Sequence, residues 1–281
     1  MDFPSVTRAL EGCYRAYVNT DGFTVKESDE IWAGIRIFEL AHRVLGFKHF
    51  VYGSIDYYLR LTNFDPKYGA HHTNAKGRVN DFLSAQASTE AFTWSILNTG
   101  AYTDMLSGGL FAPRISADGI RTFAYRLGNG HLPLMTLRDV GAFALAIFSS
   151  PAQYSGRTLN VASHFATGAD IAETFTRVMG LKGVYEDISF EEWIAGIEYA
   201  GGPVASTDPE GITVGENFEM WWPGFRDSVL LPTRDLEALR VIHPGLQSLE
   251  EWMREVRYDG TGKPLLKGFI DNGIGPGFEK K

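Results

Sequence analysis

The stretch "SDEIWAGIRIFELAHRVLGFKHFVYGS", residues 28–54, decides the fold class. Its first part places apolar side chains such as Ile31, Ile35 and Phe38 at helical spacing, with Ser28 available as the amino-terminal cap. Its last part, "KHFVYGS" (48–54), is short, aromatic and β-branched, which is typical of a strand. Because "YRAYVNT" (14–20) has the same character, the region predicts a strand–helix–strand unit.

The same alternation continues along the chain. Residues 72–86 predict a helix and residues 91–100 a strand. Further on, residues 137–151 and 167–180 predict two more helices, with a strand at 156–163 between them. Strands that alternate with helices favour a parallel sheet covered by helices on both faces.

Composition and charge exclude several classes of protein. The 281 residues carry 26 Lys+Arg against 34 Asp+Glu, a net charge of −8, which argues against direct nucleic-acid binding. No apolar run approaches the ~20 residues of a membrane span, and the first residues lack a secretory pattern. The single cysteine, Cys13, allows no disulfide within the chain, and the histidines lack metal-binding spacing. We therefore expect a cytoplasmic protein, with the nucleus as the alternative.

Six segments, in order, carry a family resemblance. They are "ALEGCYRAYVNT" (9–20), "GFKHFVYGS" (46–54), "HTNAK" with "GRVNDFL" (72–83), "FTWSILNTGAYTDML" (92–106), "PLMTLRDVGAFALAIFSSPAQYSGRTLNVAS" (133–163) and "HPGLQSLEEWMRE" (243–255). Together they resemble the NmrA-like family, an atypical branch of the short-chain dehydrogenases/reductases. The resemblance runs from about residue 5 to about residue 256.

The resemblance implies an α/β fold: a partial Rossmann-like parallel sheet, from the family's fourth strand onward, with a smaller C-terminal α+β lobe. It divides the chain into a shortened NAD(P)-binding part (1–105), the lobe interleaved with the last sheet strands (106–260) and a frayed tail (261–281). Residues 14–20 would then form an exposed edge strand, which a homodimer or the N-terminal helix could cover. The aromatic residues Trp221, Trp222 and Phe225 are interpreted as packing of the lobe rather than as a substrate wall.

The resemblance also implies NADP or NAD as cofactor, bound across the carboxyl ends of the strands. In the family, a GxxGxxG turn precedes the segment with which this sequence starts. The glycine clusters at 128–130, 201–206 and 273–277 lack the strand–turn–helix setting that phosphate binding requires. We therefore expect cofactor binding to be weak or lost.

Position by position, the resemblance assigns candidate site residues. The predicted cofactor-binding residues are Thr20, Asp21, Gly22, Lys76, Ala101, Tyr102, Thr103 and Asp104. The predicted catalytic residues are Lys76, His72 and Ser54. Three of these assignments have a plainer alternative: a solvated helix lysine at Lys76, an ordinary turn at 20–22, and a helix cap at His72.

The family's usual acid is a tyrosine four residues before the lysine, and His72 stands there. The implied function is an NAD(P)-linked oxidoreductase of a biosynthetic (secondary-metabolite) pathway acting on a small-molecule substrate, with catalysis in doubt. The alternatives are a non-catalytic NAD(P) redox sensor or transcriptional co-regulator that binds a regulatory protein through its C-terminal lobe, and a degenerate homologue.

Overall fold

The computed structural model describes residues 2–108, 110–197 and 199–262. Its first elements are helix α1 (Phe3–Leu10), strand β1 (Arg15–Asn19), helix α2 (Glu27–Arg43) and strand β2 (His49–Ile55). They confirm the expected strand–helix–strand unit. Helix α2 starts earlier than expected, because its cap position is Lys26, without a capping side chain, and Ser28 lies inside the first turn. The acidic residues of that turn suit the positive end of the helix dipole.

A four-stranded parallel sheet forms the centre of the molecule. Its order is β1-β2-β3-β8, where β3 is Thr93–Thr99 and β8 is Arg157–Asn160. Strands β2 and β3 are almost wholly buried, whereas β1 alternates between half-buried and exposed residues. Among the described strands β1 pairs only with β2, so the expected edge strand is confirmed.

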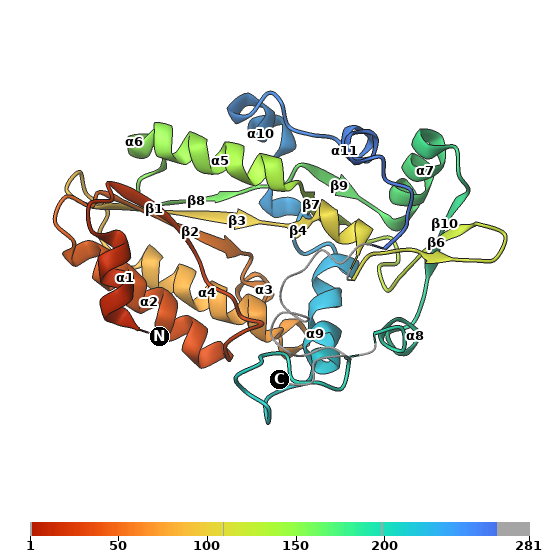
Figure 1. Cartoon of the computed structure of the whole chain (residues 1–281), viewed down its shortest axis with the longest axis horizontal. Coiled ribbons are helices and arrows are strands. Elements are labelled where there is room, and N and C mark those ends of the chain that lie inside the picture. Colours follow the sequence, from red (N-terminus) through yellow and green to blue (C-terminus); the bar gives the residue numbers. More distant parts are fainter. Residues whose placement is uncertain (1, 109, 198, 263–281) are drawn as a thin grey trace, which may run out of the picture.

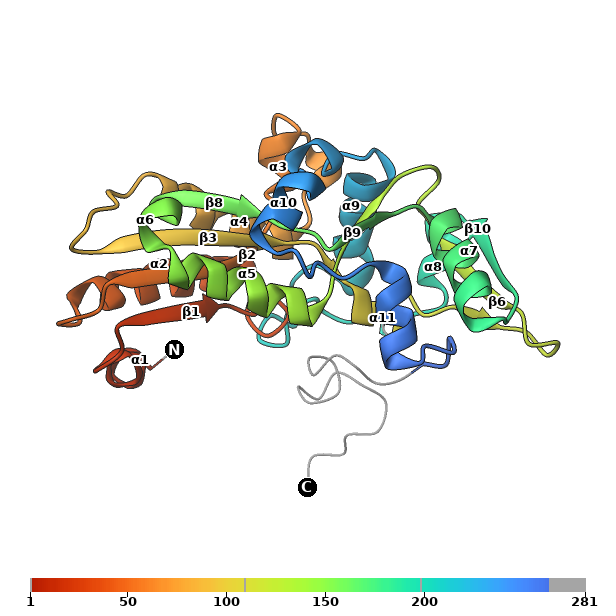
Figure 2. The ribbon, with the colours of Figure 1, turned by 90° about the horizontal axis from the view of Figure 1, so that it is seen from above.

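Helices cover both faces of this sheet, as Figures 1 and 2 show. Helices α1, α2 and α4 (His71–Ser84) lie on one face, and α5 (Leu137–Ser149) and α6 (Pro151–Tyr154) lie on the other. Successive side chains of β2 point to opposite faces. Phe50 and Tyr52 pack toward α2 and α4, whereas Val51 packs toward α5. The sheet is therefore the shared wall of two apolar cores.

Most of the remaining described elements build a second lobe, toward the right in Figure 1, whereas α10 (Leu236–Ile242) packs against α5. Between β2 and α5 lie α3 (Tyr58–Leu61), η1 (Pro66–Tyr68), β4 (Ala101–Tyr102), η2 (Thr103–Ser107), β5 (Arg114–Ile115), β6 (Arg121–Tyr125) and β7 (Leu132–Met135). After β8 lie β9 (His164–Ala166), α7 (Gly168–Met179), β10 (Gly183–Asp187), α8 (Phe190–Ile194), α9 (Val214–Arg226), η3 (Leu231–Thr233), α10 (Leu236–Ile242) and α11 (Leu249–Val256). The short strands form two three-stranded sheets, β10-β6-β5 and β4-β7-β9.

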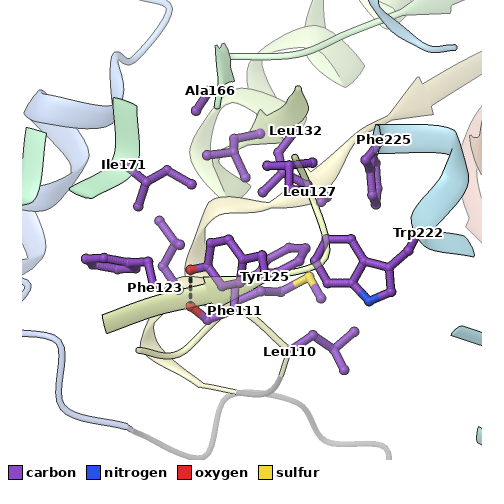
Figure 3. Packing of buried hydrophobic residues seen from close by; sticks show 14 of the residues in the cluster. Leu110, Phe111, Phe123, Tyr125, Leu127, Leu132, Ala166, Ile171, Trp222 and Phe225 are labelled. Carbon is purple, nitrogen blue, oxygen red and sulfur yellow. Dashed lines mark hydrogen bonds between the residues drawn. The ribbon is translucent and has the colours of Figure 1, made fainter. Parts of the chain in front are cut away.

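Aromatic side chains fill the core of this lobe. Figure 3 shows Trp222 and Phe225 of α9 packed beside Tyr125, whose hydroxyl donates a hydrogen bond of 2.6 Å to the carbonyl of Phe111. Trp221, Trp222 and Phe225 are all buried in this cluster, as expected of residues that pack the lobe.

Three further expectations concern membrane spans, metal sites and the C-terminal tail. No helix in the described ranges is long and apolar enough to cross a membrane. Within the same ranges, no group of three or more histidine, cysteine or acidic side chains could hold a metal ion. The expected tail falls largely on residues 263–281, which lie outside the described residues, and the three-part division of the chain stays a prediction.

Candidate functional site

A cavity of about 400 Å³ lies at the carboxyl ends of β1, β2 and β3. In a parallel α/β sheet, the loops that follow the strands meet at this edge, which is where ligands bind. The sheet side of the cavity consists of segments 19–23, 53–56 and 99–102. The opposite wall comes from the second lobe and is aromatic, with Phe218, Trp221 and Phe225. Two of the three predicted packing residues of α9 therefore also line the cavity.

The cavity brings most of the predicted site residues together. Those that line it are Thr20, Asp21, Gly22, Ser54, His72, Lys76, Ala101 and Tyr102. Thr103 and Asp104 begin η2 and are not among its lining residues. Thr103 is buried, and Asp104 lies beside Trp252, where burial raises the pKa of its carboxyl group. The cofactor roles of these residues stay predictions.

Lys76 is held entirely by protein groups. Its ammonium donates to the carbonyl of Thr20 at 2.7 Å and to Asn19 Oδ1 at 3.1 Å, and it pairs with Glu30 Oε1 at 3.2 Å. These contacts can use all three of its protons. The side chain is 12% exposed, so the alternative of a solvated helix lysine is wrong. Burial lowers the pKa of Lys76, and the neighbouring Glu30 opposes that effect.

The sequence analysis did not identify Glu30 as a site residue. It lies on the buried face of α2, four residues before Gly34, and its side chain is fully buried. Its Oε1 also accepts a 2.7 Å hydrogen bond from the Thr20 hydroxyl. Because the Thr20 hydroxyl donates its single proton to Glu30, Tyr52 must be the donor in the 2.8 Å hydrogen bond between the Tyr52 and Thr20 hydroxyl groups. Burial raises the pKa of Tyr52, with Glu30 adding to the effect.

His72 lies where α4 meets the second lobe. The Oδ1 atom of Asn217 accepts the backbone N–H of His71, which leaves the Asn217 amide nitrogen to donate to His72 Nδ1 at 2.9 Å. The ring is enclosed by Phe23 and Trp221. Burial lowers the pKa of His72 to about 4, so the imidazole is neutral at pH 7. Nδ1 accepts, so the ring's one proton is on Nε2.

Tyr17 is a second residue that the sequence analysis did not single out. It lines the cavity from β1, and a Cβ placed on Gly53 would come within 2.3 Å of its hydroxyl oxygen. Gly53 therefore leaves space for the phenol to cross the end of β2. Burial raises the pKa of Tyr17 to about 12, and Tyr102 adds to the effect. The neighbouring Ser54 is buried, and its hydroxyl donates to the carbonyl of Ile55 at 3.3 Å.

A buried ion pair joins Asp56, which lines the cavity, to Arg234. Arg234 Nη2 lies 2.6 Å from Asp56 Oδ2, and the two side chains are 0% and 4% exposed. The same guanidinium donates to the carbonyls of Thr99 at 3.1 Å and Val161 at 2.8 Å. Arg234 therefore ties the ends of β2, β3 and β8 to the segment that leads into α10. Its positive charge is balanced by Asp56.

The parallel sheet, its two helical layers and the cavity at its carboxyl edge define a Rossmann-like α/β protein. Within this class the chain belongs to the NmrA-like family, whose model matches residues 1–207. The match covers β1 to β3, the strands that shape the cavity, and confirms the resemblance found in the sequence.

Solved structures share the fold at low sequence identity. NmrA, a negative transcriptional regulator solved in complex with NADP, superimposes with a TM-score of 0.69 at 19% identity, over 90% of this chain and 76% of that one. An NADPH-dependent quinone oxidoreductase from Escherichia coli, complexed with NADPH, gives 0.67 at 16% identity, over 91% and 81%. A triphenylmethane reductase from Citrobacter sp., complexed with NADP(H), gives 0.62 at 18% identity, over 90% and 79%.

Proposed function

We propose that the chain is a non-catalytic member of its family that binds a nicotinamide-type ligand in this cavity and acts as a sensor. The observation that carries the proposal is the closed contact set of Lys76, whose ammonium is bound by Thr20, Asn19 and Glu30. A lysine that assists hydride transfer instead directs its ammonium group at the cofactor or substrate and lowers the pKa of a neighbouring acid. The similarity to NmrA, a regulator crystallised with NADP, supports the sensor role.

The phenols of Tyr17 and Tyr58 in the cavity are poor proton donors. Tyr17, Tyr58 and Tyr102 line it, and burial raises the pKa of Tyr17 to about 12 and that of Tyr58 well above its usual value. A phenol is a useful acid near neutral pH only when its pKa is brought toward that range. Because Lys76 is bonded elsewhere, it does not supply the positive charge that would do so. His72 is neutral and already accepts from Asn217.

The residues around the cavity fit one half of a dinucleotide. Aromatic walls from α9, with the polar groups of Ser54 and Thr99, suit a nicotinamide ring and its ribose. Among the described residues of the lining, the one cationic side chain, Lys76, is already paired with Glu30, and Asp21 adds a carboxylate, whereas the carboxylate of Asp56 is balanced by Arg234. A pyrophosphate does not fit that charge pattern. We therefore propose a ligand recognised through its ring and sugar.

The second candidate is an NAD(P)-linked oxidoreductase of a biosynthetic pathway. Two reductases solved with their cofactors share the fold, and the cavity is large enough for a small substrate. In this reading Lys76 would have to leave Glu30 when a cofactor binds. A regulatory protein bound through the second lobe would be the partner in the sensor reading.

Calorimetry with nicotinamide riboside, NADP and NADPH at matched ionic strength tests the proposal. We expect measurable binding of the riboside and a Kd for NADP above about 10 µM, because the phosphates gain no partners. The variant Ala101→Leu should weaken riboside binding by narrowing the cavity. Ala152→Leu, on the exposed surface of α6, is the matched control and should bind like the wild type.

A turnover assay separates the two candidates. NADPH oxidation is followed with quinone substrates, and we expect no rate above the uncatalysed one. Turnover that disappears in Lys76→Met, with circular dichroism unchanged, would replace the sensor proposal by the oxidoreductase one. Absence of riboside binding would contradict the ligand class.

A further inference from the structure

A second cavity, of about 360 Å³, lies in the second lobe where β10 leads into α8. Its lining residues are Arg126, Asp187, Ile188, Ser189, Phe190, Glu191 and Arg226. None of them lines the cavity at the sheet edge. Nothing in the proposed function uses this site.

One of its two arginines is paired with a carboxylate. Arg226 forms a two-pronged ion pair with Asp187, with nitrogen–oxygen distances of 2.9 and 3.1 Å. Asp187 also accepts the backbone N–H of Gly128 at 2.8 Å. Burial opposes ionisation of Asp187, but these hydrogen bonds prevail and lower its pKa. The Arg226–Asp187 pair is therefore electrically balanced.

Arg126 has no such partner. Over the part of the chain that the structure describes, no hydrogen bond or ion pair within 4.0 Å reaches its guanidinium, which lies over the ring of Phe190, 5.5 Å from the centroid. Its charge contributes to lowering the pKa of Asp187 and of Glu191. Its Nη1 atom is covered by protein and has no hydrogen-bond partner. A covered N–H group without a hydrogen-bond acceptor costs free energy, because it loses water and gains no replacement. Such an arrangement is expected where the partner is a ligand.

We propose that this cavity binds a carboxylate through Arg126. A guanidinium matches the two oxygens of a carboxylate in parallel hydrogen bonds, and the Phe190 ring beneath it restricts its orientation. Asp187 and Glu191 in the same lining disfavour the double charge of a phosphate more than the single charge of a carboxylate. The carboxylate belongs either to a free small acid or to the end of a polypeptide chain.

An NMR titration of the full chain tests the proposal. Acetate represents the free acid and N-acetylglycine the chain end, with chloride added to equal ionic strength as the reference. We expect saturable shifts of the backbone amides of Gly128 and Ser189, which flank the site. A tenfold stronger response to N-acetylglycine than to acetate would assign the site to a polypeptide end, and similar responses would assign it to a free acid.

Two variants make the result decisive. Arg126→Met keeps an unbranched apolar side chain on Phe190 and removes the charge, so we expect the carboxylate shifts to disappear and the thermal midpoint without ligand to stay equal or rise. Arg240→Gln is the control, because Arg240 lies on the surface in α10, paired with Glu237. It should bind like the wild type. The proposal is overturned by shifts that survive in Arg126→Met, by stronger saturation with inorganic phosphate, or by no response in the wild type.

Discussion

Removing one partner of the buried pair of Lys76 and Glu30 should strongly destabilise the protein, because the other charge stays buried. Glu30 is fully buried and Lys76 is 12% exposed, so neither charge is well solvated. Lys76→Met leaves the Glu30 carboxylate with the Thr20 hydroxyl as its remaining partner. Breaking a buried pair in this way costs ~3–5 kcal/mol of unfolding free energy. Glu30→Gln should cost less, ~1–3 kcal/mol, because Lys76 keeps its bonds to Thr20 and Asn19.

The measurement is urea unfolding of both single variants and of the double variant Glu30→Gln/Lys76→Met, followed by circular dichroism at pH 7. Residues in one network couple, so the double variant should lose ~1–3 kcal/mol less than the two single losses together. Lys67→Met is the matched control, because the Lys67–Asp227 pair is exposed. It should cost no more than ~1 kcal/mol.

A loss below ~1 kcal/mol in Lys76→Met, with no coupling to Glu30, would refute the reasoning. It would mean that the ammonium is solvated in the native protein and free to serve a ligand. The proposed sensor role would then lose its main support.

Three further outcomes are expected. The pKa of His72 is about 4 in the folded protein and near 6.5 in the unfolded one, so the neutral ring contributes fully to the free energy of unfolding above pH 7. That contribution should fall as the pH drops from 6.5 to 4, by ~2 kcal/mol at pH 5. His72→Gln should remove this part of the pH dependence when unfolding is measured at several pH values. A Cβ on Gly100 would lie 1.8 Å from the Pro133 carbonyl oxygen, so Gly100→Ala should cost ~3 kcal/mol or more, whereas Gly53→Ala, which displaces the end of a half-exposed tyrosine, should cost ~1 kcal/mol; equal costs would contradict the packing. Arg234→Met should cost ~3–5 kcal/mol in urea unfolding, because Asp56 stays buried without its cation, and Arg60→Met, from an exposed pair, should change little.

Sequence periodicity predicted the sheet and its helices well, since the signals are local. The repeat of apolar residues in 28–46 and the apolar runs in 48–54 and 91–100 became α2, β2 and β3 with bounds shifted by one to three residues. The edge position of β1 also followed from the resemblance. Strands such as β4 and β5 could not be predicted, because each has two residues and exists only through pairing with a distant partner.

The site was predicted less completely, because its decisive contacts join distant residues. The turn at Thr20 and the lysine at 76 were both selected, but the carboxylate between them comes from another helix. Arg234 and Asp56 are 178 positions apart, and neither stands in a recognisable motif. Residue spacing identifies candidate side chains on one element. Whether such a side chain can contact a ligand depends on ion pairs with other elements, as with Lys76 and Glu30.

The aromatic wall of the cavity has an optical consequence. Of the chain's six tryptophans, Trp221 borders the cavity and lies 5.8 Å, centroid to centroid, from Trp222, which in turn lies 5.2 Å from Trp193. Excitation absorbed by any of the three can pass to its neighbours, so emission from the cluster should respond as a unit when the cavity fills. A ligand with a nicotinamide ring should quench the fluorescence of this tryptophan cluster. Intrinsic tryptophan fluorescence should therefore report, without any label, whether the cavity is occupied.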